Sequence, residues 1–155
     1  MVELSEPESQ FIETMGLFCE RMGFPRIGGR MLAWLMIAQE PQTLDDIAAL
    51  LKVSKASVST NARHFVMVGM VDLVTRLGDR RTYYQWSPKA WDRRMELAQQ
   101  VIRSTREFAQ MGLGAIAADN DAGRARLEET ILFSNFFEGK TVEIAAEWES
   151  RRGRR

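Results

Sequence analysis

Residues 43–68 restrict the possible folds of this chain more than any other stretch, because they form the pattern of two short helices joined by a tight turn. Thr43 is placed to cap the first helix, and Asp45 and Asp46 then lie in the first turn, where the helix dipole favours carboxylates. Ser54 is placed to cap the second helix, directly after a Lys-Val-Ser turn. The stretch therefore predicts a helix-turn-helix.

The second of these helices is predicted to be amphipathic. Its apolar residues at 58, 62, 65 and 66 recur at spacings of three and four and so share one face, which packs inward. The opposite face and its flanks carry mostly hydroxyl, amide and basic groups, which can hydrogen-bond to base edges or phosphates in a DNA major groove. The predicted DNA contacts on this helix are Lys55, Ser57, Ser59, Thr60, Arg63 and His64.

A β-hairpin is predicted directly after the second helix. Residues 71–76 and 81–86 are rich in β-branched and aromatic side chains, and the loop between them contains Gly78. Arg76, Arg80 and Arg81 crowd this hairpin and can place a guanidinium in the minor groove or on a phosphate. Asp79 is predicted to orient a neighbouring arginine. A helix-turn-helix followed by such a hairpin is a winged helix.

Helices are predicted on both sides of the winged helix. A first helix follows Ser5 and ends at Gly23, and its stripe of Phe11, Met15, Phe18 and Met22 needs a cover from its own domain or a second subunit. A core helix spans residues 27–39, where Gly28 and Gly29 indicate close helix packing and not a phosphate loop. A long helix follows a Ser87 cap, with Pro88 at its first position, and runs to about residue 118. Further helices are predicted from residue 122 and over 140–150, before a solvated basic tail at 151–155.

The long helix suggests a dimer. At about 1.5 Å per residue it measures roughly 45 Å, which is more than one small domain can cover. The expected fold is mainly α with a small β-hairpin wing, a winged helix-turn-helix flanked by N- and C-terminal dimerisation helices. The expected segments are an N-terminal dimerisation helix at 1–26, the DNA-binding domain at 27–88, and C-terminal dimerisation helices with the basic tail at 89–155.

Charge is distributed unevenly, although the formal net charge of the 155 residues is zero. Residues 52–94 hold nine Lys or Arg against three acidic residues, whereas residues 1–51 hold three against eight. The positive segment coincides with the predicted reading helix and wing, as expected for a nucleic-acid interface. No run approaches the length of a membrane span, and no signal peptide is evident, so we expect a cytoplasmic protein.

The motifs together resemble the MarR superfamily of bacterial winged-helix repressors, and more closely its GbsR-like branch. The resemblance covers about residues 8–88 and depends on three segments: residues 23–30, residues 53–59 at the turn, and residues 78–84 in the wing. It implies a homodimer that binds a near-palindromic operator, with recognition helices about 34 Å apart. It also implies recognition by Ser57, Ser59, Thr60 and Arg63 and a wing contact by Arg80 or Arg81.

The resemblance further implies a small-molecule effector between the dimerisation helices and the winged helix. GbsR-like proteins are associated with choline and osmolyte metabolism, and a quaternary ammonium ligand would need an aromatic cage. Candidate walls, which large aromatic side chains would equally provide as ordinary core residues, are Trp34, Trp91, Phe133, Phe136, Phe137 and Trp148. No cofactor or metal is expected.

Three alternatives remain open at this stage. Cys19, the single cysteine, could make the protein a redox sensor, although apolar neighbours would raise its pKa and keep it inert. The winged helix could serve protein contacts alone, in which case DNA binding would lack a steep salt dependence. An enzyme is poorly supported, because His64 is the single histidine and no nucleophile has an evident base.

Overall fold

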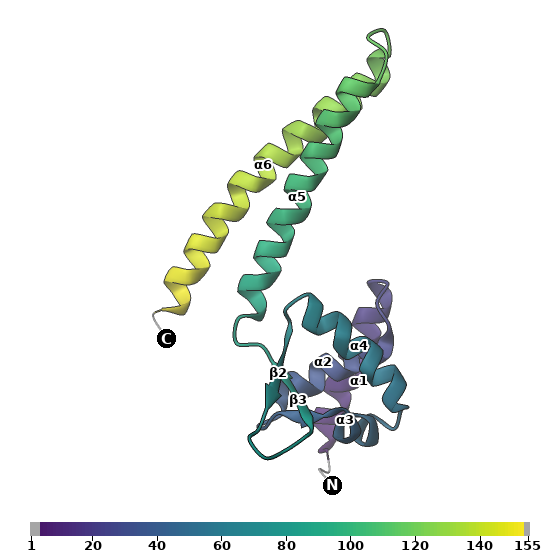
Figure 1. Ribbon diagram of the computed structural model, residues 1–155, viewed down its shortest axis with the longest axis vertical. Coiled ribbons are helices and arrows are strands. Elements are labelled where there is room, and N and C mark those ends of the chain that lie inside the picture. The colour runs from purple at the N-terminus through teal and green to yellow at the C-terminus, as the bar shows by residue number, and fades with distance from the viewer. Residues whose placement is uncertain (1–3, 154–155) are drawn as a thin grey trace. The chain divides into compact units, whose positions relative to one another are not determined.

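The computed structural model describes residues 4–153, which form two compact units, one ending at Trp91 and the other beginning at Asp92. Figure 1 shows the first as a cluster of short helices with a small sheet and the second as a pair of long helices. The first unit contains α1 (Glu6–Arg21), α2 (Arg26–Ile37), β1 (Gln42–Thr43), α3 (Leu44–Leu51), α4 (Lys55–Met67), β2 (Val71–Thr75) and β3 (Thr82–Trp86). The expected winged helix, mainly α with a β wing, is confirmed.

The predicted caps of α1, α3 and α4 are present. Ser5 and Glu8 form a capping box at the start of α1, and Thr43 and Asp46 form another at α3, where the Thr43 hydroxyl accepts from the Asp46 amide at 3.1 Å. The Ser54 hydroxyl accepts from the amide of Ser57 at 3.2 Å and caps α4. These hydrogen bonds satisfy amides that no helical carbonyl reaches, and so fix where each helix begins.

The core of the first unit is centred on α2. Residues 31–35 of this helix are all buried, so it is apolar around most of its circumference, as its sequence predicts. Ile47 and Leu51 of α3, and Val58 and Phe65 of α4, pack against it in one cluster. This packing anchors both helices of the helix-turn-helix to the same support.

Glycines allow two close helix contacts with α2. A Cβ at Gly29 would lie 2.7 Å from the Met15 carbonyl oxygen and 2.7 Å from the Cys19 Cβ, both in α1. A Cβ at Gly28 would lie 2.6 Å from the Asn61 Oδ1 in α4. The prediction that these glycines serve close helix packing is therefore confirmed.

The sheet has one strand more than predicted. Its order is β1-β3-β2, all antiparallel, and Gln42 and Thr43 of β1 pair with Tyr84 and Tyr83 of β3. Two residues are too few to show an alternating pattern in the sequence. The wing is thus joined by hydrogen bonds to the residue that caps α3.

The second unit is a helical hairpin of α5 (Ala90–Ala115) and α6 (Asp121–Arg152), of which the first two residues of α5 belong to the first unit. Three expectations need correction. α5 begins at Ala90, because the Ser87 hydroxyl accepts from the Lys89 amide and Pro88 lies in a turn, and α5 ends three residues earlier than predicted. Residues 121–152 form one continuous helix and not two. Arg151 and Arg152 lie in its last turn, whereas residues 154 and 155 of the basic tail are outside the described residues.

The first helix, α1, belongs to the first unit by its packing. Its inner side, with Ile12, Gly16 and Cys19, lies against α2. The predicted stripe lies largely on its outer side, where Phe11, Phe18 and Met22 remain exposed. A role of this stripe in a subunit interface stays a prediction.

Candidate nucleic-acid interface

The outer face of α4 is open to solvent. Val58, Ala62 and Phe65 are buried, and the helix thereby presents the residues between them outward. Lys55, Thr60, Arg63 and His64 are exposed, and Ser57 and Ser59 are half-buried. The amphipathic pattern of this helix is thus as predicted, whereas base or phosphate contact by these residues stays a prediction.

The two cations of α4 differ in their surroundings. The Lys55 ammonium lies 2.8 Å from Asp45 of α3, an exposed ion pair that water and salt weaken. Arg63 has no hydrogen bond or ion pair with any residue in the part of the chain that the structure describes. Its guanidinium can therefore bind an anion without first breaking an internal contact.

The polar residues of α4 partly bond to their own helix. The Thr60 hydroxyl donates to the Ala56 carbonyl at 3.1 Å, which leaves its oxygen lone pairs available as acceptors. The Asn61 amide donates to the Ser57 carbonyl at 2.9 Å, and its oxygen faces Gly28. The His64 ring lies against Phe24 and Phe65, with centroids 6.2 and 5.4 Å away.

The wing is held together by an ionic cluster around Tyr83. Asp79 accepts hydrogen bonds from the Tyr83 hydroxyl at 2.6 Å and from the Arg81 guanidinium and amide at 2.7 and 2.9 Å. These donors hold the pKa of the Asp79 carboxyl far below its usual range, and the same carboxylate raises the pKa of Tyr83. Asp79 thus orients Arg81, as the sequence predicts.

The three wing arginines therefore have different environments. The Arg76 guanidinium lies 4.3 Å from the centre of the Tyr83 ring and 3.5 Å from the Glu40 carboxylate. Arg81 is bound to Asp79. Arg80 is exposed and has no partner within residues 4–153, and it follows the loop in which Gly78 has a φ of 81°. Arg80 is therefore the wing cation that needs no internal bond broken in order to bind phosphate.

We expect Asp79→Asn to loosen the wing. The folded wing stabilises the ionised form of Asp79. The contribution of Asp79 to the stability of the wing is therefore complete above its ordinary pKa of about 3.9, and it is lost as the pH falls through the lowered pKa of the folded state. Hydrogen exchange of the wing amides should accelerate in the variant at pH 6. We also expect acid to reduce the protection of these amides in the parent protein, and to reduce it less in the variant. Equal protection in both proteins would contradict this assignment, and Asp119→Asn, at an exposed position outside the wing, is the control.

The predicted aromatic effector residues are divided between the two units. Trp34 is 5% exposed and lies in the core of the first unit, and Trp91 lies 6.1 Å from Trp86 in the same unit. Phe133 and Phe137 of α6 lie 5.8 Å apart, and Phe136 is exposed. The aromatic cage stays a prediction.

Cys19 has the environment of an inert thiol. It is 7% exposed, it lies under Gly29 at the contact between α1 and α2, and burial raises its pKa. A thiol is reactive as the thiolate, which this environment disfavours. The redox alternative is therefore not supported.

Comparison with known proteins gives one consistent result. A family model for MmpR5-like MarR family transcriptional regulators matches residues 89–151. The HTH-type transcriptional regulator MmpR5 of Mycobacterium tuberculosis is 28% identical over 151 residues, which is 96% of this chain and 92% of that protein. A crystal structure described as a transcriptional regulator superposes with a TM-score of 0.84 at 27% identity, over 93% of this chain and 99% of the other.

Over nearly its whole length, this chain is similar to a transcriptional regulator of the MarR type. The match to MmpR5 covers both the winged helix and the helical hairpin of this chain, whereas the sequence motifs end near residue 88. The matching family model describes MmpR5-like proteins, so the GbsR-like branch is not confirmed. None of the helices in the described part of this chain is long and apolar enough to cross a membrane.

Proposed function

We propose that this chain is a MarR-family regulator that acts in the cytoplasm as a homodimeric repressor, which places α4 of each subunit in a major groove and the wing beside it. The observation that supports this most strongly is the outer face of α4, where Arg63 is exposed and unpaired among the described residues. Hydroxyl groups of Ser57, Ser59 and Thr60 lie on or beside the same face. Short hydroxyl side chains and a long guanidinium can reach base edges and phosphates together.

The wing would add a second contact. Arg80 projects from the hairpin without an internal partner in residues 4–153, and Asp79, Arg81 and Tyr83 hold the strand that follows it in place. A free guanidinium on a rigid hairpin suits the narrow minor groove or a phosphate beside it. In this proposal Arg81 and Arg76 position the wing, and Arg80 makes the contact.

Dimerisation is proposed from the apolar side of the helical hairpin. Leu97, Val101 and Phe133 line an open groove of about 310 Å³ between α5 and α6, and Phe108 and Leu132 are 69% and 70% exposed. Elsewhere between the two helices, Glu138 of α6 pairs with Arg103 and Arg106 of α5. An apolar face this extended on a polar hairpin is typical of a subunit interface, because monomeric proteins rarely expose one.

The test is DNA binding to the regulator's own upstream region across a range of salt concentrations. If phosphates are contacted, the affinity falls steeply with salt, and Arg80→Ala reduces the slope of log affinity against log salt by about 1. A flat salt dependence would favour the alternative in which the winged helix contacts only protein.

We expect Arg63→Ala to cost about 1 to 3 kcal/mol of discrimination at one base pair. The reason is that a guanidinium in the major groove makes a directed bond to a base edge. Binding measured on a set of operators with single base changes would show preference lost at one position. A loss of equal size on every sequence would assign Arg63 to phosphate instead, and Arg124→Ala on α6 is the matched control.

A small-molecule effector is the least constrained part of the proposal. Such a ligand changes DNA affinity only by stabilising one conformation of the dimer over another. A quaternary ammonium ligand was expected from the GbsR-like resemblance alone, and that branch is not confirmed. The helical hairpin contains a second, polar cavity that suits a ligand of different chemistry.

A further inference from the structure

A second cavity lies between the N-terminal part of α5 and the last turns of α6. It has a volume of about 270 Å³, small beside the cavities that hold drug-sized ligands. Its lining includes apolar groups from both helices and four charged side chains, three acidic and one basic. The lining residues are Asp92, Met95, Glu96, Gln99, Ala145, Trp148, Glu149 and Arg152. All of them belong to the second unit.

One carboxylate of the cavity already holds a cation from the chain. The Asp92 carboxylate accepts a hydrogen bond from the Arg152 guanidinium and, through its other oxygen, one from the Trp148 indole at 3.1 Å. Arg152 is the last residue of α6, so it can leave this position without breaking helical hydrogen bonds further along. The Asp92 carboxylate thus binds a guanidinium and an indole N–H at the same time.

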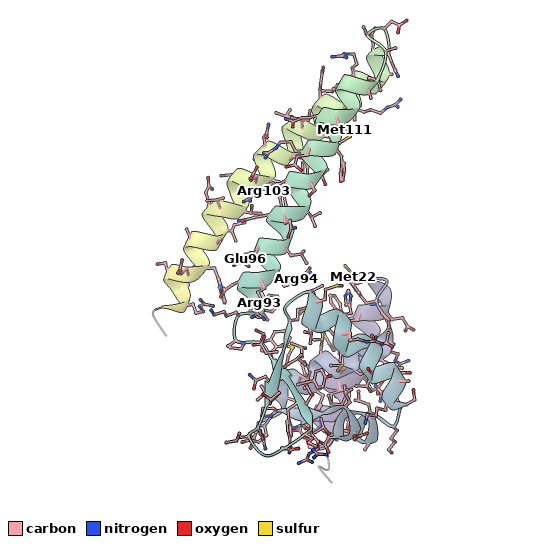
Figure 2. The ribbon with its side chains drawn as sticks, in the orientation of Figure 1. Met22, Arg93, Arg94, Glu96, Arg103 and Met111 are labelled. Carbon is pink, nitrogen blue, oxygen red and sulfur yellow. The ribbon has the colours of Figure 1, made fainter. Side chains whose placement is uncertain are left out.

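The other two carboxylates have no such partner. The side chains of Glu96 and Glu149 make no hydrogen bond or ion pair with any residue between 4 and 153. Figure 2 labels Glu96 near the N-terminal end of α5, two turns before Arg103. With one arginine against three carboxylates, the lining keeps an excess of negative charge. This charge attracts a cation from solution, which would compete with Arg152 for the Asp92 carboxylate.

We propose that this cavity binds a small organic cation with N–H donors, of the guanidinium or alkylamine class, which Glu96 and Glu149 hold beside Trp148 in competition with Arg152. Carboxylates accept hydrogen bonds and donate none, so a cation with N–H groups satisfies them. A quaternary ammonium ion has no such donor and binds through the indole and charge alone. Asp92 and Glu96 lie in the N-terminal part of α5, so a bound ligand would contact the segment that follows the winged helix.

Binding is tested on the full chain without DNA, so that it can succeed or fail independently of the proposed DNA-binding function. The indole N–H signal of Trp148, assigned with Trp148→Phe, is followed by NMR during titration at constant ionic strength. The probes are ethylguanidine, its neutral isostere ethylurea, and choline as a cation without N–H donors. We expect saturable binding of ethylguanidine, weaker binding of choline, and none of ethylurea.

Charge-neutral variants separate this site from general attraction to an acidic surface. Glu96→Gln and Glu149→Gln should each weaken ethylguanidine binding by about three- to tenfold, whereas Glu129→Gln elsewhere on α6 should leave it unchanged. Arg152→Ala should tighten binding, because the internal competitor is gone. Arg151→Ala, which removes the same charge from a residue paired with Glu147, should not.

Several outcomes would overturn the proposal. They are equal binding of ethylguanidine and ethylurea, no saturation by any probe, and equal effects of Arg152→Ala and Arg151→Ala. Tighter binding of choline than of ethylguanidine would overturn the requirement for N–H donors and return the site to the quaternary ammonium class. DNA affinity of the ligand-free protein, measured separately, is unaffected by any of these results.

Discussion

Gly29→Ala is expected to destabilise the winged-helix unit by about 1 to 3 kcal/mol, a large part of the marginal stability of such a unit. The added methyl would lie 2.7 Å from the Met15 carbonyl oxygen and 2.8 Å from the Cys19 sulfur. A backbone carbonyl in the middle of α1 cannot rotate away, so the two helices must separate. Chemical denaturation followed by circular dichroism measures the change.

The same substitution at other glycines provides the controls. At Gly139 of α6 an added Cβ meets nothing within 4 Å, so Gly139→Ala should stabilise its helix by about 0.5 to 1 kcal/mol. The change in stability caused by Gly16→Ala should lie between those of Gly29→Ala and Gly139→Ala, because the atom nearest to the added methyl belongs to the flexible Arg30 side chain. A Gly29 variant as stable as the Gly139 variant would show that the contact between α1 and α2 is looser than described.

The second large effect is expected for Phe108→Glu on α5. Phe108 is 69% exposed in the single chain, so the substitution should leave the fold of the hairpin intact. In the proposed dimer it would bury a charge in the apolar interface, which is strongly unfavourable. We expect a monomer in analytical ultracentrifugation. We also expect a decrease in operator affinity of about 10²- to 10⁴-fold, because the two winged helices would no longer bind the operator together.

Gln110→Glu adds the same charge two residues further along α5, at an exposed position outside the apolar face. It should remain a dimer and bind the operator as the parent protein does. If both variants were dimers with unchanged affinity, the apolar face of α5 and α6 would not be the subunit interface. If both were monomers, the charge would act through the stability of the hairpin and not through the interface.

The sequence was sufficient to predict the winged helix because its signals are local. Thr43, Ser54 and the loop at Gly78 each mark a boundary through a hydrogen bond or a φ value that depends on neighbouring residues. The three-four spacing of Val58, Ala62 and Phe65 likewise predicted the buried face of α4. The outer face of that helix, and therefore its candidate contacts, followed from the same periodicity.

Features that depend on distant residues could not be predicted in this way. The sequence placed Arg76, Arg80 and Arg81 together in the wing. The different partners of these arginines depend on where Tyr83, Asp79 and Glu40 lie in the folded chain. The cavity at Trp148 brings together residues more than 50 positions apart in the chain. No periodic pattern carries information about such a pairing.

The contact at Gly28 has a consequence for how such a regulator can be controlled. Gly28 of α2 lies directly against Asn61 and Phe65 of α4, so α4 has little room to tilt or slide relative to α2. In the proposed dimer, a signal would therefore act less on the shape of each α4 helix than on the distance between the α4 helices of the two subunits.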